Sequence, residues 1–388
     1  MDVKKEFVLE AMQLNINFTE LCTKYGISTK TGYKWKTRFI QEGFSGLNDQ
    51  SKRPNSSPKQ ISEEVVLELI RIKNKKPKWG PKKIRAIYEQ KHKKETVPSL
   101  STVERILKKA GFVTARKKRR QNTGIRIENR IDATKSNEVW TVDFKGWWYT
   151  PTKEKVNPLT VRDDYSKYIL SIKALDKGDI PSVKAEFECL FRIYGLPDVI
   201  RSDNGPPFAS MSSLLGLTKL SVWWMALGIK LDRIEPGSPY QNGSHERMHL
   251  DMKNELENQI EGDIRLHQAE FEKWRNEYNK ERPHEALGMK TPEQVYTKSN
   301  IKYESEIENM EYPGQYRSRK VNDRGFINYK GVRYFIGNPF SGYMLGIKQE
   351  KDEEPKVRFG TILIGSLNKE SKLLEPEHTL VNKGISSK

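Results

Sequence analysis

The order of strand-like and helix-like segments between residues 138 and 282 is the feature that most limits how this chain can fold. Three runs with a strand pattern come first, joined by short turns, and they predict an antiparallel meander. The later segments alternate between helix and strand, which predicts parallel pairing through helical crossovers. The expected strands are residues 139–149, 158–166, 167–175, 197–203 and 229–234, and the expected helices are residues 180–195, 217–228, 242–260 and 266–282. This order predicts a mixed α/β sheet with helices covering both faces.

Three acidic residues stand at distinctive places along these segments. Asp143 lies within the first strand-like run, and Asp203 follows a short apolar strand and meets a turn. Glu246 opens a helix after a loop rich in Pro, Gly and Asn. Carboxylates that arrive from two strands and a helix can converge to hold hard divalent cations, as metal-assisted phosphodiester chemistry requires. Each could instead be an ordinary surface acid, although Asp is a poor strand former, so the place of Asp143 between Val142 and Phe144 is informative.

The positive charge of the chain is concentrated in its first third. Of the 69 Lys and Arg residues and the 51 Asp and Glu residues, 32 and 14 lie in residues 1–135, and the remaining 37 and 37 cancel. The whole net charge of +18 therefore belongs to the N-terminal region. A basic arm on a neutral body is typical of a polyanion-binding region attached to a catalytic one, and the alternative is a solubility feature without a partner.

The basic region contains two helical units. In the first, a helix over residues 3–14, a short second helix, a turn at Gly26 and a helix capped by Ser28 form a helix-turn-helix pattern. The second unit follows a polar linker with two prolines and ends at Gly111. Such units contact DNA through basic side chains, and the alternative is an ordinary solvated helix hairpin. The residues expected to contact DNA, including one in the α/β region, are Lys30, Lys34, Lys36, Arg38, Lys117, Lys118, Arg119, Arg120 and Lys253.

Beyond residue 298 the pattern becomes all-β, with short strands separated by turns, and this predicts a small barrel. Its partner is open between DNA and a neighbouring subunit, since the chain beyond residue 135 is neutral. The expected domains are a helix-turn-helix domain (1–47), a linker (48–60), a second helix-turn-helix unit with or without a wing (61–113), a basic linker (114–135), the α/β core (136–297), the barrel (298–370) and a polar tail (371–388). The expected fold is therefore multidomain: all-α, then α/β, then all-β.

Several observations concern the cellular compartment. The N-terminal residues lack an apolar signal core, and the sequence has no run of about 18 apolar residues that could span a membrane. Cys22 and Cys189 are too few for a disulfide framework or a zinc site. We therefore expect a soluble cytoplasmic protein in a reducing compartment, with no membrane partner, that joins the bacterial nucleoid when it binds DNA.

Several short motifs together resemble the integrase-core transposases of bacterial insertion sequences, which are relatives of retroviral integrases. The motifs are WTVDF (140–144), RSDNGPPF (201–208), PYQNGSHER (239–247), YNKERPHEAL (278–287) and TP (291–292). Each motif alone is weak, but the combination is specific, and the resemblance covers roughly residues 1–300. It implies a ribonuclease-H-like core with an acidic triad. The triad matches Asp143, Asp203 and Glu246, which the resemblance implies are both catalytic and metal-binding.

The same resemblance implies an enzyme, a metal-dependent polynucleotidyl transferase that hydrolyses the 3′ ends of its element and transfers them to target DNA. The expected cofactor is Mg²⁺ or Mn²⁺, as two ions about 4 Å apart. The expected partners are the terminal repeats of the element, the target DNA and further copies of the chain on paired ends. Forty-two residues separate Asp203 from Glu246, more than in many relatives, and we expect the surplus in residues 210–221. The zinc-binding N-terminal domain of retroviral integrases is absent, so the kinship implies no zinc.

Residues 245–249, HERMH, also fit the HExxH pattern of zinc proteases, with two histidines one helical turn apart. A protease would leave Asp203, its turn and the basic arm unexplained. We therefore expect His245 and His249 to line the DNA groove or to lie on the surface. Asp163 and Asp164 compete for the metal site, but their place at an expected hairpin turn favours a structural role in that turn.

Lys253 lies two helical turns after Glu246 on the same face, where it could contact a phosphate of the element's end or be an ordinary solvated lysine. Two further functions are open. A non-catalytic DNA-binding regulator derived from a transposase would share the basic arm, but the intact triad argues against it. A simple ribonuclease H would have no need of that arm.

Overall fold

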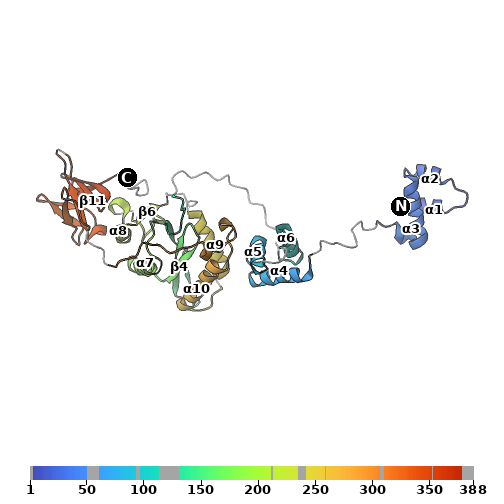
Figure 1. The fold of residues 1–388 in the computed structure, drawn as a ribbon, viewed down its shortest axis with the longest axis horizontal. Coiled ribbons are helices and arrows are strands. Elements are labelled where there is room, and N and C mark those ends of the chain that lie inside the picture. The colour runs from blue at the N-terminus through green and yellow to red at the C-terminus, as the bar shows by residue number, and fades with distance from the viewer. Residues whose placement is uncertain are drawn as a thin grey trace. The chain divides into compact units, whose positions relative to one another are not determined.

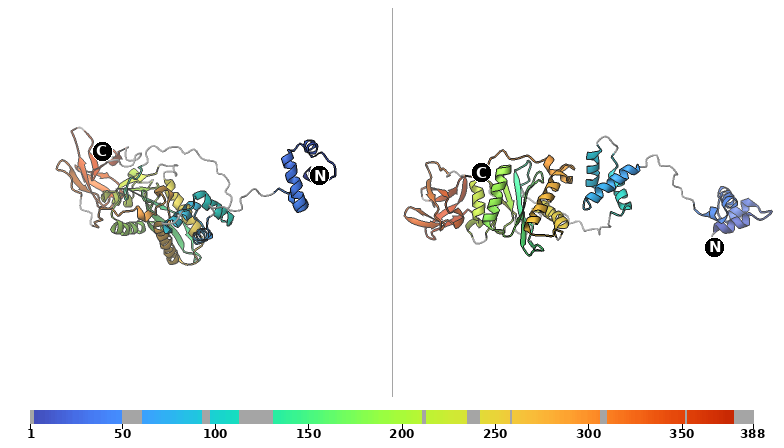
Figure 2. Two further views of the ribbon diagram at one scale, coloured as in Figure 1. Left: turned by 45° about the vertical axis from the view of Figure 1, so that its right-hand side comes forward. Right: turned by 90° about the horizontal axis from the view of Figure 1, so that it is seen from below.

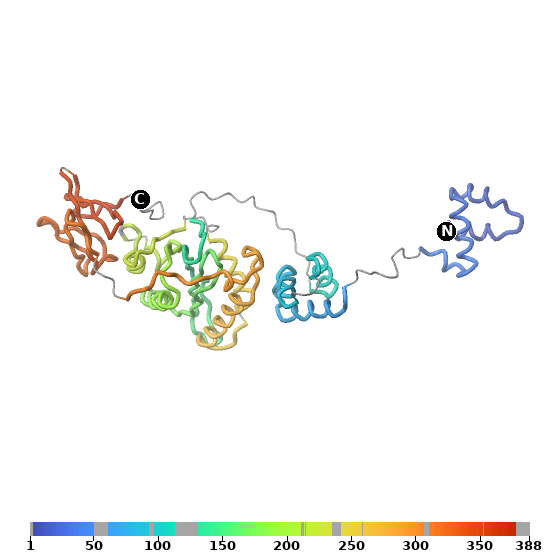
Figure 3. The backbone as a smooth tube through the Cα atoms, viewed as in Figure 1, coloured from blue at the N-terminus to red at the C-terminus, as the bar shows by residue number. Residues whose placement is uncertain are grey.

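The computed structural model describes residues 3–49, 61–92, 97–112, 131–210, 213–234, 242–257, 259–305, 310–351 and 353–377 (Figure 1). The chain divides into two compact units, Met1–Ser62 and Glu63–Lys388. The tube in Figure 3 traces the backbone of each unit from element to element. Among the helices in these ranges, none has the length and apolar composition needed to cross a membrane.

The first unit is helical and consists of α1 (Val3–Ala11), α2 (Phe18–Lys24), α3 (Thr29–Glu42) and the 3-10 helix η1 (Gly43–Leu47). Ser28 caps α3 as predicted, because its hydroxyl accepts a hydrogen bond from the backbone N–H of Thr31 at 3.2 Å. Gly32 allows α3 to approach its neighbours, since a Cβ there would lie 2.7 Å from Cys22 Sγ and 2.9 Å from Phe7 Cζ. The predicted helix-turn-helix pattern is confirmed, although α1 is shorter than expected.

A second group of helices comprises α4 (Glu63–Lys75), α5 (Pro81–Lys91) and α6 (Leu100–Lys109). Their core consists of Leu69, Ile72, Trp79, Ile84, Tyr88, Val103 and Leu107. The buried Lys73 ammonium donates hydrogen bonds to the carbonyls of Pro77 and Trp79, both at 2.7 Å, and so keeps its charge solvated by the backbone. The expected basic cluster Lys117, Lys118, Arg119 and Arg120, and any wing, lie outside the described residues.

The α/β region is built on one mixed sheet. Its strands are β1 (Val139–Phe144), β2 (Trp148–Tyr149), β3 (Lys155–Asp163), β4 (Ile169–Leu175), β5 (Val199–Ser202) and β6 (Lys230–Arg233). The order across the sheet is β4-β3-β1-β5-β6, with β2 pairing to the start of β3. Strands β1, β3 and β4 are antiparallel, whereas β5 is parallel to β1 and to β6. The predicted meander and the predicted parallel strands are both confirmed.

Helices cover both faces of this sheet (Figure 2). One face packs against α7 (Ile180–Tyr194) and α8 (Lys219–Ala226), and the other against α9 (Gly243–Leu256) and α10 (Ile264–Lys280). Trp140 and Val142 of β1 belong to the apolar cluster on the α7 face. Successive strand residues point to opposite faces, so Thr141 and Asp143 point toward α9. The remaining 3-10 helices of this region are η2 (Leu214–Gly216), η4 (Glu285–Leu287) and η5 (Pro292–Gln294).

Two predicted boundaries in the α/β region need correction. The first strand-like run ends at Phe144, and its last aromatic residues form the separate strand β2, so Asp143 is near the end of β1 and not in its middle. Helix α9 ends at Leu256, earlier than the expected residue 260. A strand that stops just after Asp143 leaves this carboxylate near the carboxyl end of a central strand of the sheet.

The C-terminal strands form a nearly closed β-barrel, as predicted. The strands are β7 (Arg317–Lys320), β8 (Phe326–Tyr329), β9 (Val332–Phe335), β10 (Met344–Lys348), β11 (Lys356–Phe359), β12 (Ile362–Asn368) and β13 (Leu373–Pro376), with η6 (Asn338–Phe340) between β9 and β10. Their order is β7-β10-β11-β12-β13-β9-β8, and Arg319 of β7 donates to the carbonyl of Asn328 in β8 at 3.0 Å, which brings the two edges together. The barrel continues past the boundary expected at residue 370, because the apolar Leu374 of β13 is buried in its core.

Candidate active site

The pairing of β1 with β5 brings Asp143 and Asp203 together. The two strands are parallel, and Val139, Trp140 and Thr141 pair with Val199, Ile200 and Arg201, always sixty residues apart. Continuing this register by two residues sets Asp143 beside Asp203. Asp203 lies just after β5, beyond the last paired residues, and its negative charge raises the pKa of Asp143, so the two carboxylates lie near each other. Two acids far apart in the sequence thus meet at the carboxyl ends of neighbouring strands.

Glu246 in the first turn of α9 is close enough to act on Asp143 electrostatically. The pKa of Asp143 is raised to about 7, mainly by burial, then by the negative charge of Asp203, with a further contribution from Glu246. A hydrogen bond from the backbone N–H of Phe144 works in the opposite direction. The Asp143 side chain is 23% exposed, whereas Asp203 and Glu246 are exposed. The structure therefore brings Asp203 and Glu246 near the partly buried carboxylate of Asp143, the third predicted acid.

Asp203 is held by the turn that follows it. The backbone N–H of Gly205 donates to Asp203 Oδ1 at 3.2 Å, and the side-chain amide of Asn204 donates to the carbonyl of Ile234 at the end of β6. A Cβ at residue 205 would lie 3.2 Å from Asp203 Oδ2. A side chain there would press on the carboxylate, which explains why glycine follows Asn204 at this point.

Asn242, just before α9, is a site residue that the sequence reasoning missed. Its side chain is buried, and its Nδ2 atom donates to Asp143 Oδ2 at 3.4 Å. The signal was present in the motif PYQNGSHER, in which Asn242 was treated as part of the loop. Asn242 thus supplies a neutral hydrogen-bond donor to the Asp143 carboxylate, which is repelled by the negative charges of Asp203 and Glu246.

For His245 the expectation of a surface or groove position is wrong, whereas His249 is partly exposed and lies beside Asp143. His245 is fully buried, with Nδ1 2.8 Å from the hydroxyl of Thr141 and Nε2 2.6 Å from the hydroxyl of Thr160. His249 Nε2 lies 2.7 Å from the same Thr160 hydroxyl. Burial lowers the pKa of both imidazoles, that of His249 to about 3. Both ring nitrogens of His245 are engaged by threonine, so the pair is not arranged as zinc ligands.

Helix α9 is anchored to the sheet along one side. Met248, Met252 and Leu256 pack into the apolar cluster between sheet and α10. At the start of the helix the buried Arg162 of β3 donates to the carbonyl of Ser244 at 2.7 Å and to its hydroxyl at 3.0 Å. These contacts hold the first turn of α9, and with it Glu246, over the carboxyl ends of the central strands.

The predicted DNA-contact residues that the structure describes lie on two helices. Lys253 is exposed on α9, and Glu257 pairs with it at 3.7 Å and with Lys145 at 3.3 Å. On α3 the basic residues at positions 30, 34 and 38 recur every four residues and so share one face. The ammonium of Lys36 instead lies over the ring of Phe18, 5.6 Å from its centre.

The donor set of Asp143, Asp203 and Glu246 suits a hard divalent cation, because all its atoms are carboxylate oxygens. A cation would also relieve the repulsion that raises the pKa of Asp143. Within the described residues, however, no three His, Cys, Asp or Glu side chains are close enough together to form a finished metal cage. The three acids therefore fit a cation in the chemistry of their oxygen atoms, although their described positions do not form a finished site.

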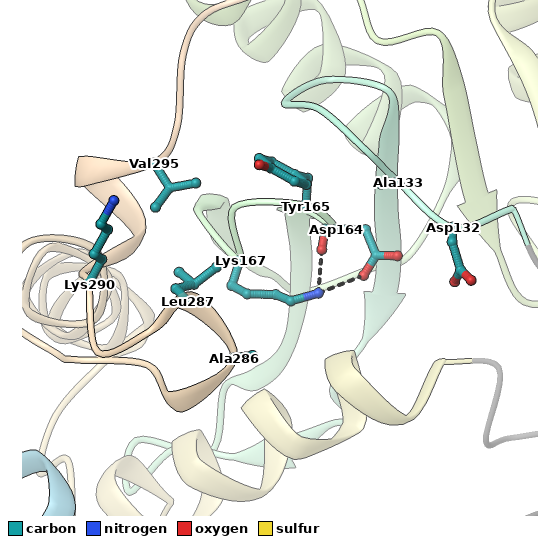
Figure 4. A pocket seen from close by; sticks show the side chains of 9 residues that line it. All are labelled: Asp132, Ala133, Asp164, Tyr165, Lys167, Ala286, Leu287, Lys290 and Val295. Carbon is teal, nitrogen blue, oxygen red and sulfur yellow. Dashed lines mark hydrogen bonds and ion pairs between the residues drawn. The ribbon is translucent and has the colours of Figure 1, made fainter.

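Asp163 and Asp164, the competing acids, lie at the opposite end of β1. Asp163 pairs in register with Trp140, and its Oδ2 accepts from the N–H of Ser166 at 2.8 Å, which confirms its service in the turn. Asp164 lies 3.2 Å from the guanidinium of Arg201 and is buried. A cavity of about 500 Å³ opens beside Asp164, and Figure 4 shows Lys167 within it, bonded to this acid. Neither acid belongs to the cluster around Asp143.

The comparison with protein families matches four parts of the chain. Residues 133–239 and residues 227–292 each match a family described as an integrase core domain. Residues 3–55 match a helix-turn-helix domain, and residues 31–107 match a homeodomain-like domain. The integrase-core matches contain all three acids of the cluster, and the other two cover the helices of the basic region.

Two curated relatives are proteins of bacterial insertion elements. The uncharacterized 31.7 kDa protein of insertion element IS407 from Burkholderia multivorans is 27% identical over 255 residues, which are 65% of this chain and 88% of that protein. The uncharacterized 39.2 kDa protein of insertion element IS476 from Xanthomonas euvesicatoria is 26% identical over 260 residues, 65% of this chain and 70% of that protein.

Similar solved structures come from retroviruses. The HTLV-2 integrase catalytic core domain, solved in complex with magnesium, has 19% identity and a TM-score of 0.33, over 42% of this chain and 99% of that chain. A simian T-cell lymphotropic virus intasome has 13% identity and a TM-score of 0.37, over 70% of this chain and 92% of that chain. On the family matches and the insertion-element relatives, this chain is an integrase-core domain protein with helix-turn-helix domains, related to the proteins of insertion elements IS407 and IS476.

Proposed function

We propose that this protein is a transposase that binds the ends of its mobile element, cuts their 3′ ends in a metal-dependent reaction and joins them to target DNA. The observation that carries the proposal is the strand register that sets Asp143 beside Asp203, on the face where α9 brings in Glu246. Like charges repel, so carboxylates gathered at one point, with the pKa of one raised, favour a cation-binding site over a structural cluster.

Asp143, Asp203 and Glu246 would hold Mg²⁺ or Mn²⁺, and two ions suit the chemistry. When bound, such ions stabilise charge on a phosphate and make water or a hydroxyl a better nucleophile. Asp143 near the end of β1 and Asp203 just after β5 would supply carboxylate oxygens to a cation, and Glu246 would add its own from the helix. Carboxylates bind these cations in preference to softer metals, which favour nitrogen and sulfur.

The proposed reaction has two steps that use the same site. In end cleavage, a water oxygen bonds to phosphorus as the P–O3′ bond breaks, which leaves a 3′-hydroxyl on the element. In strand transfer, that hydroxyl bonds to a phosphorus of the target while the target's own P–O3′ bond breaks. Each step exchanges one phosphodiester oxygen for another, so the protein's main task is to orient the nucleophile, the phosphate and the leaving oxygen.

Several basic residues are proposed to hold the DNA. Lys253 is exposed two turns after Glu246 and is placed for a phosphate near the cut. Lys30, Lys34, Lys36 and Arg38 on α3, with Lys117, Lys118, Arg119 and Arg120 in the basic linker, would contact the terminal repeat. Two ends must be cut and joined together, which favours a homo-oligomer. The domain boundaries given above stay a prediction.

The test uses the purified full-length protein and duplexes that carry the DNA ends flanking its gene, with Mg²⁺ or Mn²⁺. We expect 3′-end cleavage by the wild type and its loss in Glu246→Gln, with end binding unchanged. Glu261→Gln is the matched control, since it removes an exposed carboxylate just beyond α9. Cleavage retained by Glu246→Gln would remove Glu246 from the site. Specific end binding without cleavage by the wild type would instead favour a non-catalytic regulator.

A further inference from the structure

We propose that Thr160 is a positioning residue of the active site: its hydroxyl joins β1, β3 and α9, and thereby fixes where Glu246 lies relative to Asp143. The inference rests on the proposed function, because it concerns how that catalytic cluster is assembled. It assigns a purpose to the two histidines that the HExxH pattern singled out, and it starts from a threonine that the sequence did not mark.

The Thr160 hydroxyl has three hydrogen-bond partners, and it is fully buried. Its oxygen lies 2.9 Å from the carbonyl oxygen of Asp143, 2.6 Å from His245 Nε2 and 2.7 Å from His249 Nε2. A hydroxyl offers one hydrogen and two acceptor sites, so three partners saturate it. One oxygen atom therefore links the backbone of a proposed ligand to two side chains of the helix that carries another.

The carbonyl partner assigns the proton of the Thr160 hydroxyl. The carbonyl of Asp143 can only accept, so it takes the single hydrogen of Thr160. Both imidazoles must then donate through Nε2–H. His245 Nδ1 is then an acceptor 2.8 Å from the hydroxyl of Thr141, whose single hydrogen is shared between this nitrogen and the carbonyl of Arg162 at 3.3 Å.

The same tautomer leaves an acceptor at the active site. His249 Nδ1 carries no proton and lies 3.9 Å from Asp143 Oδ2. The Asp143 carboxylate is therefore bordered by the Asn242 amide and by this ring, and the Thr160 hydroxyl holds the ring in place. Removal of the hydroxyl would leave His249 Nε2 without this partner and His245 held only through its Nδ1 contact with Thr141.

This network fixes the register of α9 on the sheet, which apolar packing alone does not do. Met248 and Met252 make flexible, non-directional contacts with the sheet. Hydrogen bonds from His245 and His249 to one oxygen, by contrast, set both the height and the rotation of the first helical turn. A displacement of about 1 Å at a reacting centre can lower a rate by about 100-fold. His245 directly precedes Glu246, so loss of this register would move the carboxylate.

The first experiment compares Thr160→Val, which loses the hydroxyl at nearly constant shape, with Thr160→Ser, which keeps it. In full-length protein we expect Thr160→Val to lower the rate of end cleavage by about 100-fold, to raise the Mg²⁺ concentration needed for half-maximal rate, and to leave end binding unchanged. Thr160→Ser should restore most of the rate. Thr150→Val is the control for stability, since Thr150 is also buried and hydrogen-bonded, but to Thr152 and Glu154.

Two readouts do not depend on activity. Nitrogen-15 NMR of histidine-labelled protein should show Nε2-protonated neutral rings for His245 and His249 in the wild type, and altered signals in Thr160→Val. Titration with Mn²⁺, followed by electron paramagnetic resonance, should show weaker binding by Thr160→Val than by Thr150→Val.

These readouts separate the two proposals. A wild type that binds Mn²⁺ more tightly than Thr160→Val does, but never cuts DNA, would overturn the proposed function and support the positioning role of Thr160. Equal rates and equal Mn²⁺ binding in wild type and Thr160→Val would overturn the positioning role. Equal losses in Thr160→Val and Thr150→Val would overturn it as well, because they would reduce the effect to general destabilisation.

Discussion

The two ends of strand β1 each lie beside a pair of acids, and the surroundings of the two pairs are opposite. At its start, Asp163 accepts hydrogen bonds from Ser166 and from the backbone N–H of Asn137, and Asp164 faces the guanidinium groups of Arg162 and Arg201. At its end, Asp143 faces the negative charges of other carboxylates. The first pair is compensated by the protein itself, whereas the second lacks comparable compensation.

The causes of the pKa shifts at Asp163 and Asp143 show the same contrast. Burial raises the pKa of both Asp163 and Asp143. At Asp163, hydrogen bonds from Ser166 and Asn137 work against this rise and the charge of Asp164 adds only a smaller contribution to it, while at Asp143 the charge of Asp203 is the second-largest cause of the rise. A buried acid with its own donors stabilises a turn, and a buried acid among other acids is suited to an external cation. The comparison thus separates a structural acid at the end of β3 from a candidate functional acid near the end of β1.

The largest expected effect is on catalysis at the end of β5. Asp203→Asn should lower end cleavage by at least about 1,000-fold, because it removes a proposed cation ligand. Asp198→Asn, at the other end of the same strand, should leave the rate within about twofold of the wild type. Rates are measured on end duplexes at saturating protein. Similar rates for the two variants would break the contrast between the ends of the sheet.

The next effect is on stability at the start of β1. Asp164→Asn should lower the free energy of unfolding by about 3 kcal/mol, since it leaves Arg162 and Arg201 buried without their shared carboxylate. Urea unfolding, followed by tryptophan fluorescence, measures the change. The outcome that would contradict the comparison is a stable variant with a selective loss of cleavage.

Asp143→Asn should change the free energy of unfolding in the opposite direction to Asp164→Asn. The pKa of Asp143 is raised from 3.8 to about 7 in the folded state, so folding favours the protonated acid. Wild-type stability should therefore fall as pH rises from about 4 to 7 and stay low above that. The variant lacks this loss, so without divalent cations it should be the more stable protein at pH 8, by no more than about 4 kcal/mol. Urea unfolding at pH 5 and pH 8 with a chelator tests this. A difference between wild type and variant that is the same at both pH values would refute it.

The smallest effect is stabilisation by the cation. At pH 8, Mg²⁺ at about ten times its dissociation constant should raise the free energy of unfolding of the wild type by about 1.4 kcal/mol. Asp143→Asn should respond less, and Asp164→Asn, although less stable, should respond as the wild type does. Melting curves with and without Mg²⁺ measure the shifts. An equal response in all three proteins would place the cation elsewhere.

Much of the fold was predictable because it follows from local patterns. Apolar runs predict the strands that contain Thr141 and Val199, and the residue type of Ser28 predicts the helix cap. The three acids were identified because each sits in an unusual local context. The role of the two histidines was not predictable, since spacing on a helix says which residues share a face but not what that face meets.

The sequence by itself determined the order of the elements, the basic arm, the barrel and the choice of the three acids as site candidates, because periodicity, turn residues and charge are properties of short segments. Only the tertiary structure decided that Asp143 lies beside Asp203, that Thr160 faces His245 and His249, and that Asp164 is neutralised by arginines. These pairings depend on the register between strands and on the position at which α9 packs against the sheet. Register is set by the packing of the whole core, so no single segment contains it.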